Sequence, residues 1–162
     1  SPFKIRGTEI DVIMDLMIHD LDIIMSLNKS TINNIQASGA SVLTKKTDIA
    51  NARITFENGC VCNLSASRIS QKIERKMRVF QKNSYFSLDY QACELDSYKK
   101  LREGGMTKIK KTKDVFTEND SLNEEIKSFI KCIKNKKDPV VDAIDGINAL
   151  KYAMRISNLI KK

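Results

Sequence analysis

The stretch DVIMDLMIHDLDIIM, residues 11–25, contains the single histidine of this 162-residue chain. The spacing of its apolar residues predicts a helix over residues 11–27. At 100° per residue, Asp15, His19 and Asp22 fall within about 60° of one another and form one narrow polar stripe. A helix that is apolar on nearly every other side is usually buried, and charged side chains are rarely buried without partners. We therefore expect the stripe to face a partner or to line a cleft.

The residue types alone leave two interpretations of this stripe open. In the first, the carboxylates of Asp15 and Asp22 hold the His19 imidazole in a satisfied core network and set its tautomer. In the second, His19 is an acid/base group that a neighbouring carboxylate orients for proton transfer.

The middle of the chain is rich in strand signals. Asn58-Gly59 separates two of the β-rich runs, and this dipeptide favours a hairpin because both turn positions tolerate positive φ. Strands joined by short turns pair antiparallel. The predicted strands are residues 32–42, 49–56, 60–69, 73–80, 85–90, 95–101 and 106–113.

Two further helices are predicted near the end of the chain, separated by a break at residues 135–139. Asp142 is a suitable N-cap or first-turn acid for the last helix. Both apolar stripes are expected to be core rather than a cofactor-binding element; they consist of Leu122, Ile126, Phe129, Ile130 and Ile133, and of Ile147, Leu150, Met154 and Ile160. The fold class is therefore α+β, a predominantly antiparallel mixed β-sheet with helices packed on one face.

Composition excludes several classes of protein. Hydrophobic residues make up 41% and charged residues 30%, as in globular domains. No apolar run approaches the roughly 18 residues of a membrane span, and no secretory signal is visible.

The four cysteines lack zinc-knuckle spacing, so we expect free thiols in the cytoplasm and no metal. We expect the net charge of +8 to belong mainly to solvated surface, with an anionic small ligand or a nucleic acid as the alternatives. No helix-turn-helix, zinc-finger or RNP pattern supports a basic nucleic-acid-binding domain.

The octet from Asp15 to Asp22 resembles the D-x-x-x-H-x-x-D signature of the Gfo/Idh/MocA oxidoreductases, the glucose–fructose and inositol dehydrogenase family. Other blocks resemble that family's C-terminal domain in the same order and cover nearly the whole chain: SPFKIRGTEIDVIMDLMIHDLDI, DIANARITFENG, LSASRIS and DPVVDAIDGINALKYAMRI. The residues of the first block are most similar to the corresponding segment of the sugar-nucleotide 3-dehydrogenases. One departure is that Glu9, Ile10 and Asp11 stand where many members carry glycines.

The resemblance implies that residues 1–162 are a C-terminal substrate-binding and oligomerisation domain. Family members begin with a Rossmann domain that binds NAD or NADP through a G-x-G-x-x-G/A loop. The six glycines here do not form that loop, and the Glu-Lys-Pro segment that supplies a lysine in many members is absent. We therefore expect the Rossmann domain to be missing from this chain, and the chain alone to bind no cofactor and to be inactive.

The resemblance also implies an activity and its residues. The complete protein would be an NAD(P)-dependent dehydrogenase of a secondary alcohol on a sugar, sugar nucleotide or cyclitol, and a homodimer or homotetramer through its sheet. His19 would be the catalytic acid/base with Asp15 beside it, and the weaker substrate-binding candidates are Asp22, Arg6, Arg53 and Arg68. Each arginine could instead form a surface or inter-strand salt bridge. The alternative function is a non-catalytic oligomerisation or partner-binding module.

Overall fold

The structure is a computed structural model that describes residues 9–103, 106–117 and 120–161. Arg6 therefore lies outside the described residues. The chain divides into two compact units, one formed by Ser1–Gln71 with Cys132–Lys162 and the other by Lys72–Lys131.

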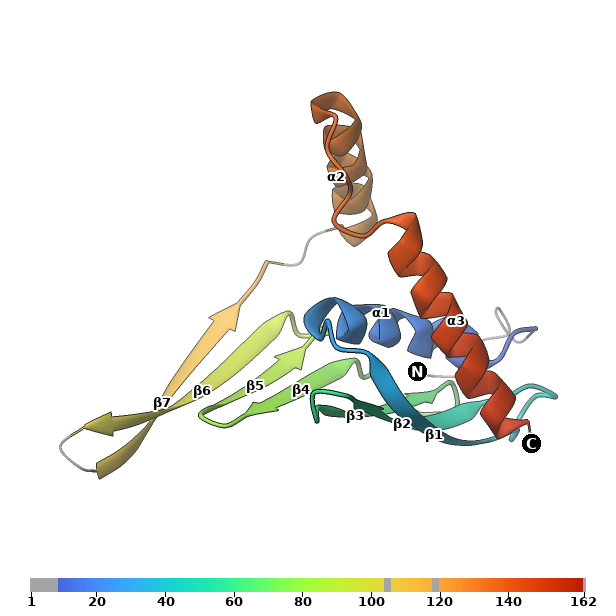
Figure 1. The fold of residues 1–162 in the computed structure, drawn as a ribbon, viewed down its shortest axis with the longest axis horizontal. Coiled ribbons are helices and arrows are strands. Elements are labelled where there is room, and N and C mark those ends of the chain that lie inside the picture. Colours follow the sequence, from blue (N-terminus) through green and yellow to red (C-terminus); the bar gives the residue numbers. More distant parts are fainter. Residues whose placement is uncertain (1–8, 104–105, 118–119, 162) are drawn as a thin grey trace. The chain divides into compact units, whose positions relative to one another are not determined.

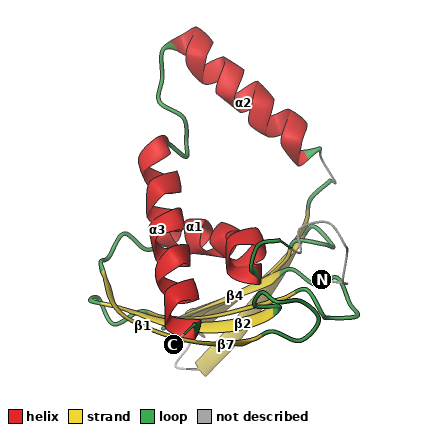
Figure 2. Cartoon of the chain, turned by 90° about the vertical axis from the view of Figure 1, so that its right-hand side faces the viewer, coloured by secondary structure: helices red, strands yellow, loops and turns green. Residues whose placement is uncertain are grey.

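The first unit packs helices on one face of a three-stranded antiparallel sheet (Figures 1 and 2). The sheet order is β1 (Ile32–Ala40), β2 (Ile49–Phe56) and β3 (Val61–Ser67). The helices are a short π-helix η1 (Ile13–Met17), its continuation α1 (Ile18–Leu27), and α3 (Ala143–Ile160). Gly59 has φ +81° in the turn between β2 and β3, as the Asn-Gly signal predicts.

Alternation of side chains along the strands creates the core of this unit. Ala50, Ala52 and Ile54 point toward the helices and are buried, whereas Asn51 and Arg53 between them are exposed. The buried cluster joins both helices to the sheet and includes Val12, Ile13, Met17, Leu21, Ile35, Phe56, Leu64, Ala66, Ala153 and Ile156.

Gly39 lies where the end of α3 approaches β1. A Cβ atom at this position would come within 2.8 Å of the Ile49 carbonyl oxygen and 3.1 Å of Ile160 Cδ1. Because the carbonyl belongs to the paired strand and cannot move aside cheaply, only glycine allows α3 and the sheet to approach this closely.

The second unit is a four-stranded antiparallel sheet. Its strands lie in chain order: β4 (Lys76–Gln81), β5 (Ser84–Asp89), β6 (Glu94–Glu103) and β7 (Met106–Val115). Val79, Phe86 and Leu88 share one face and are half-buried. The other face carries a row of aromatic rings, in which Tyr85 lies 4.8 Å from Phe80 and 5.4 Å from Tyr98 between ring centroids.

The fold class and all seven predicted strands are confirmed, with the strands divided between two sheets rather than joined in one. The sheets separate because residues 68–75, between β3 and β4, form bends and irregular backbone. The predicted helices are also confirmed, including α2 (Ser121–Asn135) and the Asp142 cap, whose side chain accepts hydrogen bonds from the Ile144 and Asp145 amides.

The prediction that the apolar stripes of α2 and α3 are core is wrong. All five stripe residues of α2 are at least 45% exposed, and on α3 Ile147, Leu150 and Met154 are exposed while Ile160 is half-buried. The buried side of α3 instead carries Ala149, Ala153 and Ile156. Small alanines allow α3 to lie close to α1 and β1, and the larger apolar side chains are left on the outside.

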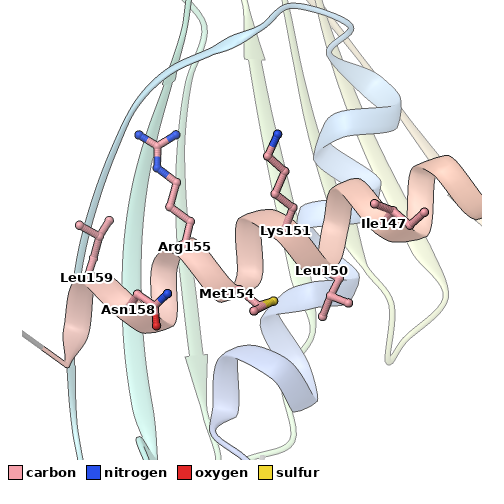
Figure 3. Close-up of a pocket in the computed structure, with 7 residues that line it drawn as sticks. All are labelled: Ile147, Leu150, Lys151, Met154, Arg155, Asn158 and Leu159. Carbon is pink, nitrogen blue, oxygen red and sulfur yellow. The ribbon is translucent and has the colours of Figure 1, made fainter.

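The exposed side of α3 forms an open, mostly apolar hollow of about 600 Å³ (Figure 3). Leu150 and Met154 project to one side of the helix in this view, and Lys151 and Arg155 project to the other. Every residue that lines the hollow belongs to α3 itself, so it is an uncovered helix face rather than an enclosed ligand cavity.

Candidate functional site

The polar stripe lies on a helix that changes type along its length. The Asp15 amide donates to the Asp11 carbonyl, a regular α-helical bond of 3.1 Å. The Ile18 amide donates to the Ile13 carbonyl five residues back, which is the bond of a π-turn. Asp15 therefore lies within the π-turn, and His19 follows in the first turn of α1. Single π-turns within helices are rare and occur frequently at functional sites.

The stripe occupies the outer side of this helix. Ile13, Met17 and Leu21 are fully buried on the inner side, whereas His19 is exposed and Asp15 and Asp22 are half-buried. Within the described residues, the three polar side chains make no hydrogen bond or ion pair with one another. The interpretation as a satisfied core network therefore does not match the structure, and the role of His19 as an acid/base group stays a prediction.

Asp11 fixes the start of this helix. One carboxylate oxygen, Oδ1, accepts a hydrogen bond of 2.9 Å from the Met14 amide and so caps the first turn. The other, Oδ2, accepts a 2.6 Å bond from the Ser157 hydroxyl of α3. The position at which many family members carry glycine thus holds a buried carboxylate in this protein. An aspartate just before an apolar-periodic run is an N-cap signal, so the sequence itself contains a cue to this role.

Arg68 is held by contacts within the protein. It is 5% exposed, its Nε lies 3.7 Å from Asp48 Oδ1, and its Nη2 donates a 2.7 Å hydrogen bond to the Ile10 carbonyl. The separation of Arg68 Nε and Asp48 Oδ1 is that of an ion pair and is too long for a hydrogen bond. Arg68 thus ties the segment before η1 to the sheet, and its substrate-binding role stays a prediction.

Asp48 is a buried carboxylate that the sequence analysis missed. Its Oδ2 accepts hydrogen bonds of 2.7 to 2.8 Å from the Val42, Leu43 and Thr44 amides, and its Oδ1 accepts from the Thr44 hydroxyl. Burial alone would raise the pKa of Asp48, but the hydrogen bonds from Thr44, Leu43 and Val42 outweigh it and lower the pKa to about 2. The carboxylate therefore holds the β1–β2 connection in place.

Arg53 is not brought to the stripe. It lies on the outer face of the first sheet, opposite the helices, where its Nη1 donates a 3.1 Å hydrogen bond to Asn63 Oδ1. This face is polar, and Gln36, Asn51 and Ser65 lie around Arg53 in a shallow hollow of about 370 Å³. Arg53 and His19 therefore belong to opposite sides of the unit.

Other classes of site find little support in the described part of the chain. No group of three or more histidine, cysteine or acidic side chains there could hold a metal ion. None of the described helices is both long and apolar enough to cross a membrane. The four cysteines are free thiols, and burial together with the nearby Cys60 raises the pKa of Cys62 to about 11.

Comparison with protein families identifies the domain. The oxidoreductase family, C-terminal alpha/beta domain, of the Gfo/Idh/MocA proteins matches residues 5–158. The chain belongs to this family. The resemblance noted from its sequence blocks is thereby confirmed over almost its full length.

Individual relatives of this family domain include a sugar-nucleotide enzyme. The chain is 35% identical over 159 residues to a UDP-N-acetylglucosamine 3-dehydrogenase of Acidithiobacillus ferrooxidans, covering 96% of this chain and 50% of that protein. A solved structure of UDP-N-acetylglucosamine 3-dehydrogenase GnnA from the same organism superimposes with a TM-score of 0.91 at 33% identity, over 99% of this chain and 52% of that one.

A more distant structure shares the fold alone. A levoglucosan dehydrogenase solved in complex with NADH has a TM-score of 0.75 at 13% identity, over 93% of this chain and 48% of that one. The family domain described here thus spans about half the length of the relatives it matches.

Proposed function

We propose that this family domain is the substrate-binding and oligomerisation part of an NAD(P)-dependent oxidoreductase that acts on a secondary alcohol of a sugar nucleotide. The observation that carries the proposal is the exposed His19 in the D-x-x-x-H-x-x-D octet, on the outer side of a helix whose inner side is buried. The 35% identity to a UDP-N-acetylglucosamine 3-dehydrogenase supports a sugar nucleotide over a cyclitol.

The described residues do not fit the pyrophosphate of a nicotinamide cofactor. Gly39, Gly59 and Gly146 lie in a strand, a hairpin turn and a helix, and none opens a helix after a strand as a dinucleotide-binding loop requires. A second, dinucleotide-binding domain would therefore hold NAD(P). The uncovered apolar faces of α2 and α3 support an interface with such a domain, because contiguous exposed apolar surface marks interaction sites.

The residues of this domain would handle the proton of the reaction. Oxidation of a secondary alcohol requires a group that accepts the hydroxyl proton as the carbon loses hydride, and reduction requires its return. An imidazole nitrogen of His19 would serve as that acceptor and donor. Asp15, one turn earlier, would accept a hydrogen bond from the imidazole or from a substrate hydroxyl, and Asp22 would support the helix from the next turn.

The direct test is an assay of the full-length protein with UDP-N-acetylglucosamine and either NAD or NADP. We expect reduced cofactor to form together with a 3-keto product, which mass spectrometry identifies by the loss of two hydrogens. UDP-glucose is the matched control, because it differs only in carrying a hydroxyl in place of the acetamido group at carbon 2. Turnover of neither compound would contradict the proposed substrate class.

Residues 1–162 alone are expected neither to bind NADH nor to oxidise a sugar nucleotide. The chain contains no glycine loop to cradle a pyrophosphate at a helix N-terminus. Calorimetric titration of the chain with NADH measures this directly, with the full-length protein as the positive control. A low-micromolar dissociation constant for the chain alone would show that it contains a cofactor site.

The domain is expected to self-associate through the apolar face of its second sheet. Val79, Phe86 and Leu88 are only half-buried there, and an obligate interface typically buries upward of about 2,000 Å². Sedimentation at micromolar concentration should show a dimer or larger. Phe86→Lys should weaken association, whereas Ser87→Lys, on the opposite face, should not. A wild-type monomer of 18.4 kDa would contradict this expectation.

A further inference from the structure

We propose that the π-turn of η1, held by Asp11 and Ser157, aligns Asp15 with His19 for proton transfer. The inference rests on the proposed function and deepens it by naming two positioning residues, neither of which belongs to the octet. Asp11 and Ser157 are 146 positions apart in the sequence and meet through a 2.6 Å hydrogen bond.

The π-turn changes the angular relation between the two proposed catalytic groups. In a regular α-helix, residues four apart are offset by about 40° around the axis. A π-turn contains more residues per turn, so a four-residue separation that begins within it brings Asp15 and His19 closer to one line along the helix. Such an alignment would let both side chains reach one substrate hydroxyl.

Three hydrogen bonds determine where this helix begins. Asp11 Oδ1 accepts from the Met14 amide at 2.9 Å, and Asp11 Oδ2 accepts from the Ser157 hydroxyl. The Val12 amide donates to the Thr47 carbonyl at 2.9 Å. Conversion of η1 to a regular α-helix would shift the first turns by one residue and displace the Met14 amide or the Asp11 carboxylate. The three hydrogen bonds therefore favour the π-turn over a regular α-helix.

The burial of Asp11 and Ser157 indicates that their hydrogen bond specifies one register of the helix that contains η1. Asp11 is 8% exposed and Ser157 is 5% exposed, and Ser157 follows Ile156 on the buried side of α3. An alanine at position 157 would fit the same space without a polar group to desolvate. Buried polar groups in such places are best attested as devices that select one register among competing arrangements.

The test compares four variants of the full-length protein, with UDP-N-acetylglucosamine as substrate. In Ser157→Ala and Asp11→Asn we expect kcat to fall about 10- to 100-fold, because small displacements of reacting groups have effects of that size. The KM for the cofactor should not change. Ser157→Thr keeps the hydroxyl and should keep most of the activity. Asp142→Ala is the matched control, since it removes the N-cap side chain of α3, 15 residues before Ser157.

A crystal structure of Ser157→Ala provides a readout independent of activity, with a regular α-helix expected over residues 13–17. If Asp11→Asn fails to fold, the comparison of Ser157→Ala with Ser157→Thr alone decides whether the inference holds. Unchanged kcat in Ser157→Ala, or an equal loss in Asp142→Ala, would overturn the inference while the proposed function stands. An inactive wild-type protein would overturn the proposed function and this inference with it.

Discussion

His19→Ala in the full-length protein is expected to lower kcat by about 10²- to 10⁴-fold, the usual contribution of a positioned acid/base group. That loss corresponds to roughly 3–5 kcal/mol of transition-state stabilisation. Stability should change little, because the His19 side chain is exposed and only the inner side of its helix is buried. Measuring kcat and the thermal midpoint on the same preparation separates the two effects.

Neighbouring positions provide the controls for His19. Asp15→Asn should lower kcat less, because it alters only the orientation of His19 or of the substrate. Asp22→Asn should mainly affect folding. Ser26→Ala, in the last turn of α1, removes an exposed hydroxyl that bonds only to the Ile23 carbonyl, and should keep wild-type activity. Near-wild-type kcat in folded His19→Ala would remove His19 from the mechanism and favour the non-catalytic module.

Asp48→Asn is expected to destabilise the domain by about 3–5 kcal/mol, the usual cost of removing one partner from a buried ion pair. An asparagine amide would point an NH₂ group at one or more of the Val42, Leu43 and Thr44 amides, where the carboxylate accepts hydrogen bonds. It would also remove the buried ion pair between Asp48 and Arg68. Urea unfolding of the chain measures the difference.

The same carboxylate predicts a dependence of stability on pH. The folded-state pKa of Asp48 is about 2, below its ordinary value of 3.8. Its contribution, about 2 kcal/mol from the size of the shift, is therefore present above pH 4 and lost as the pH falls toward 2. Asp48→Asn should remove this part of the acid dependence.

Asp89→Asn is the matched control for Asp48. Asp89 also accepts hydrogen bonds from two backbone amides, of Gln91 and Ala92, and pairs with Lys76 at 3.3 Å, but its side chain is 28% exposed. Solvent can replace those bonds in the variant, so the loss of stability should be much smaller. Equal losses in the two variants would show that burial adds nothing to the contribution of Asp48.

Local patterns were sufficient to predict the elements of this fold. Alternation of apolar and polar residues in β2 and the Asn58-Gly59 turn identify a hairpin from about twenty consecutive residues. Helical periodicity identifies α1 and the stripe of Asp15, His19 and Asp22 in the same way. Such signals depend only on the geometry of one strand or helix, so they can be read before the tertiary arrangement is known.

Two features of the structure depended on packing that no local pattern encodes. The apolar periodicity of α3 does not indicate which side of the helix faces the sheet. Because the α3 backbone lies close to its neighbours, the side with Ala149 and Ala153 is buried and the side with Leu150 and Met154 is exposed. The Asp48 carboxylate and the three amides it binds form a network only because β1 and β2 pair.

The sequence by itself thus determined the family, the α+β class and the position of the single histidine on a helix. The tertiary structure decided that His19 is exposed, that Arg53 lies on the opposite face of the sheet, and that η1 is a π-turn. The difference has one physical cause. Periodicity reports the side chains of neighbouring residues, whereas the bond between Asp11 and Ser157 joins positions 146 apart, which only the packed chain brings together.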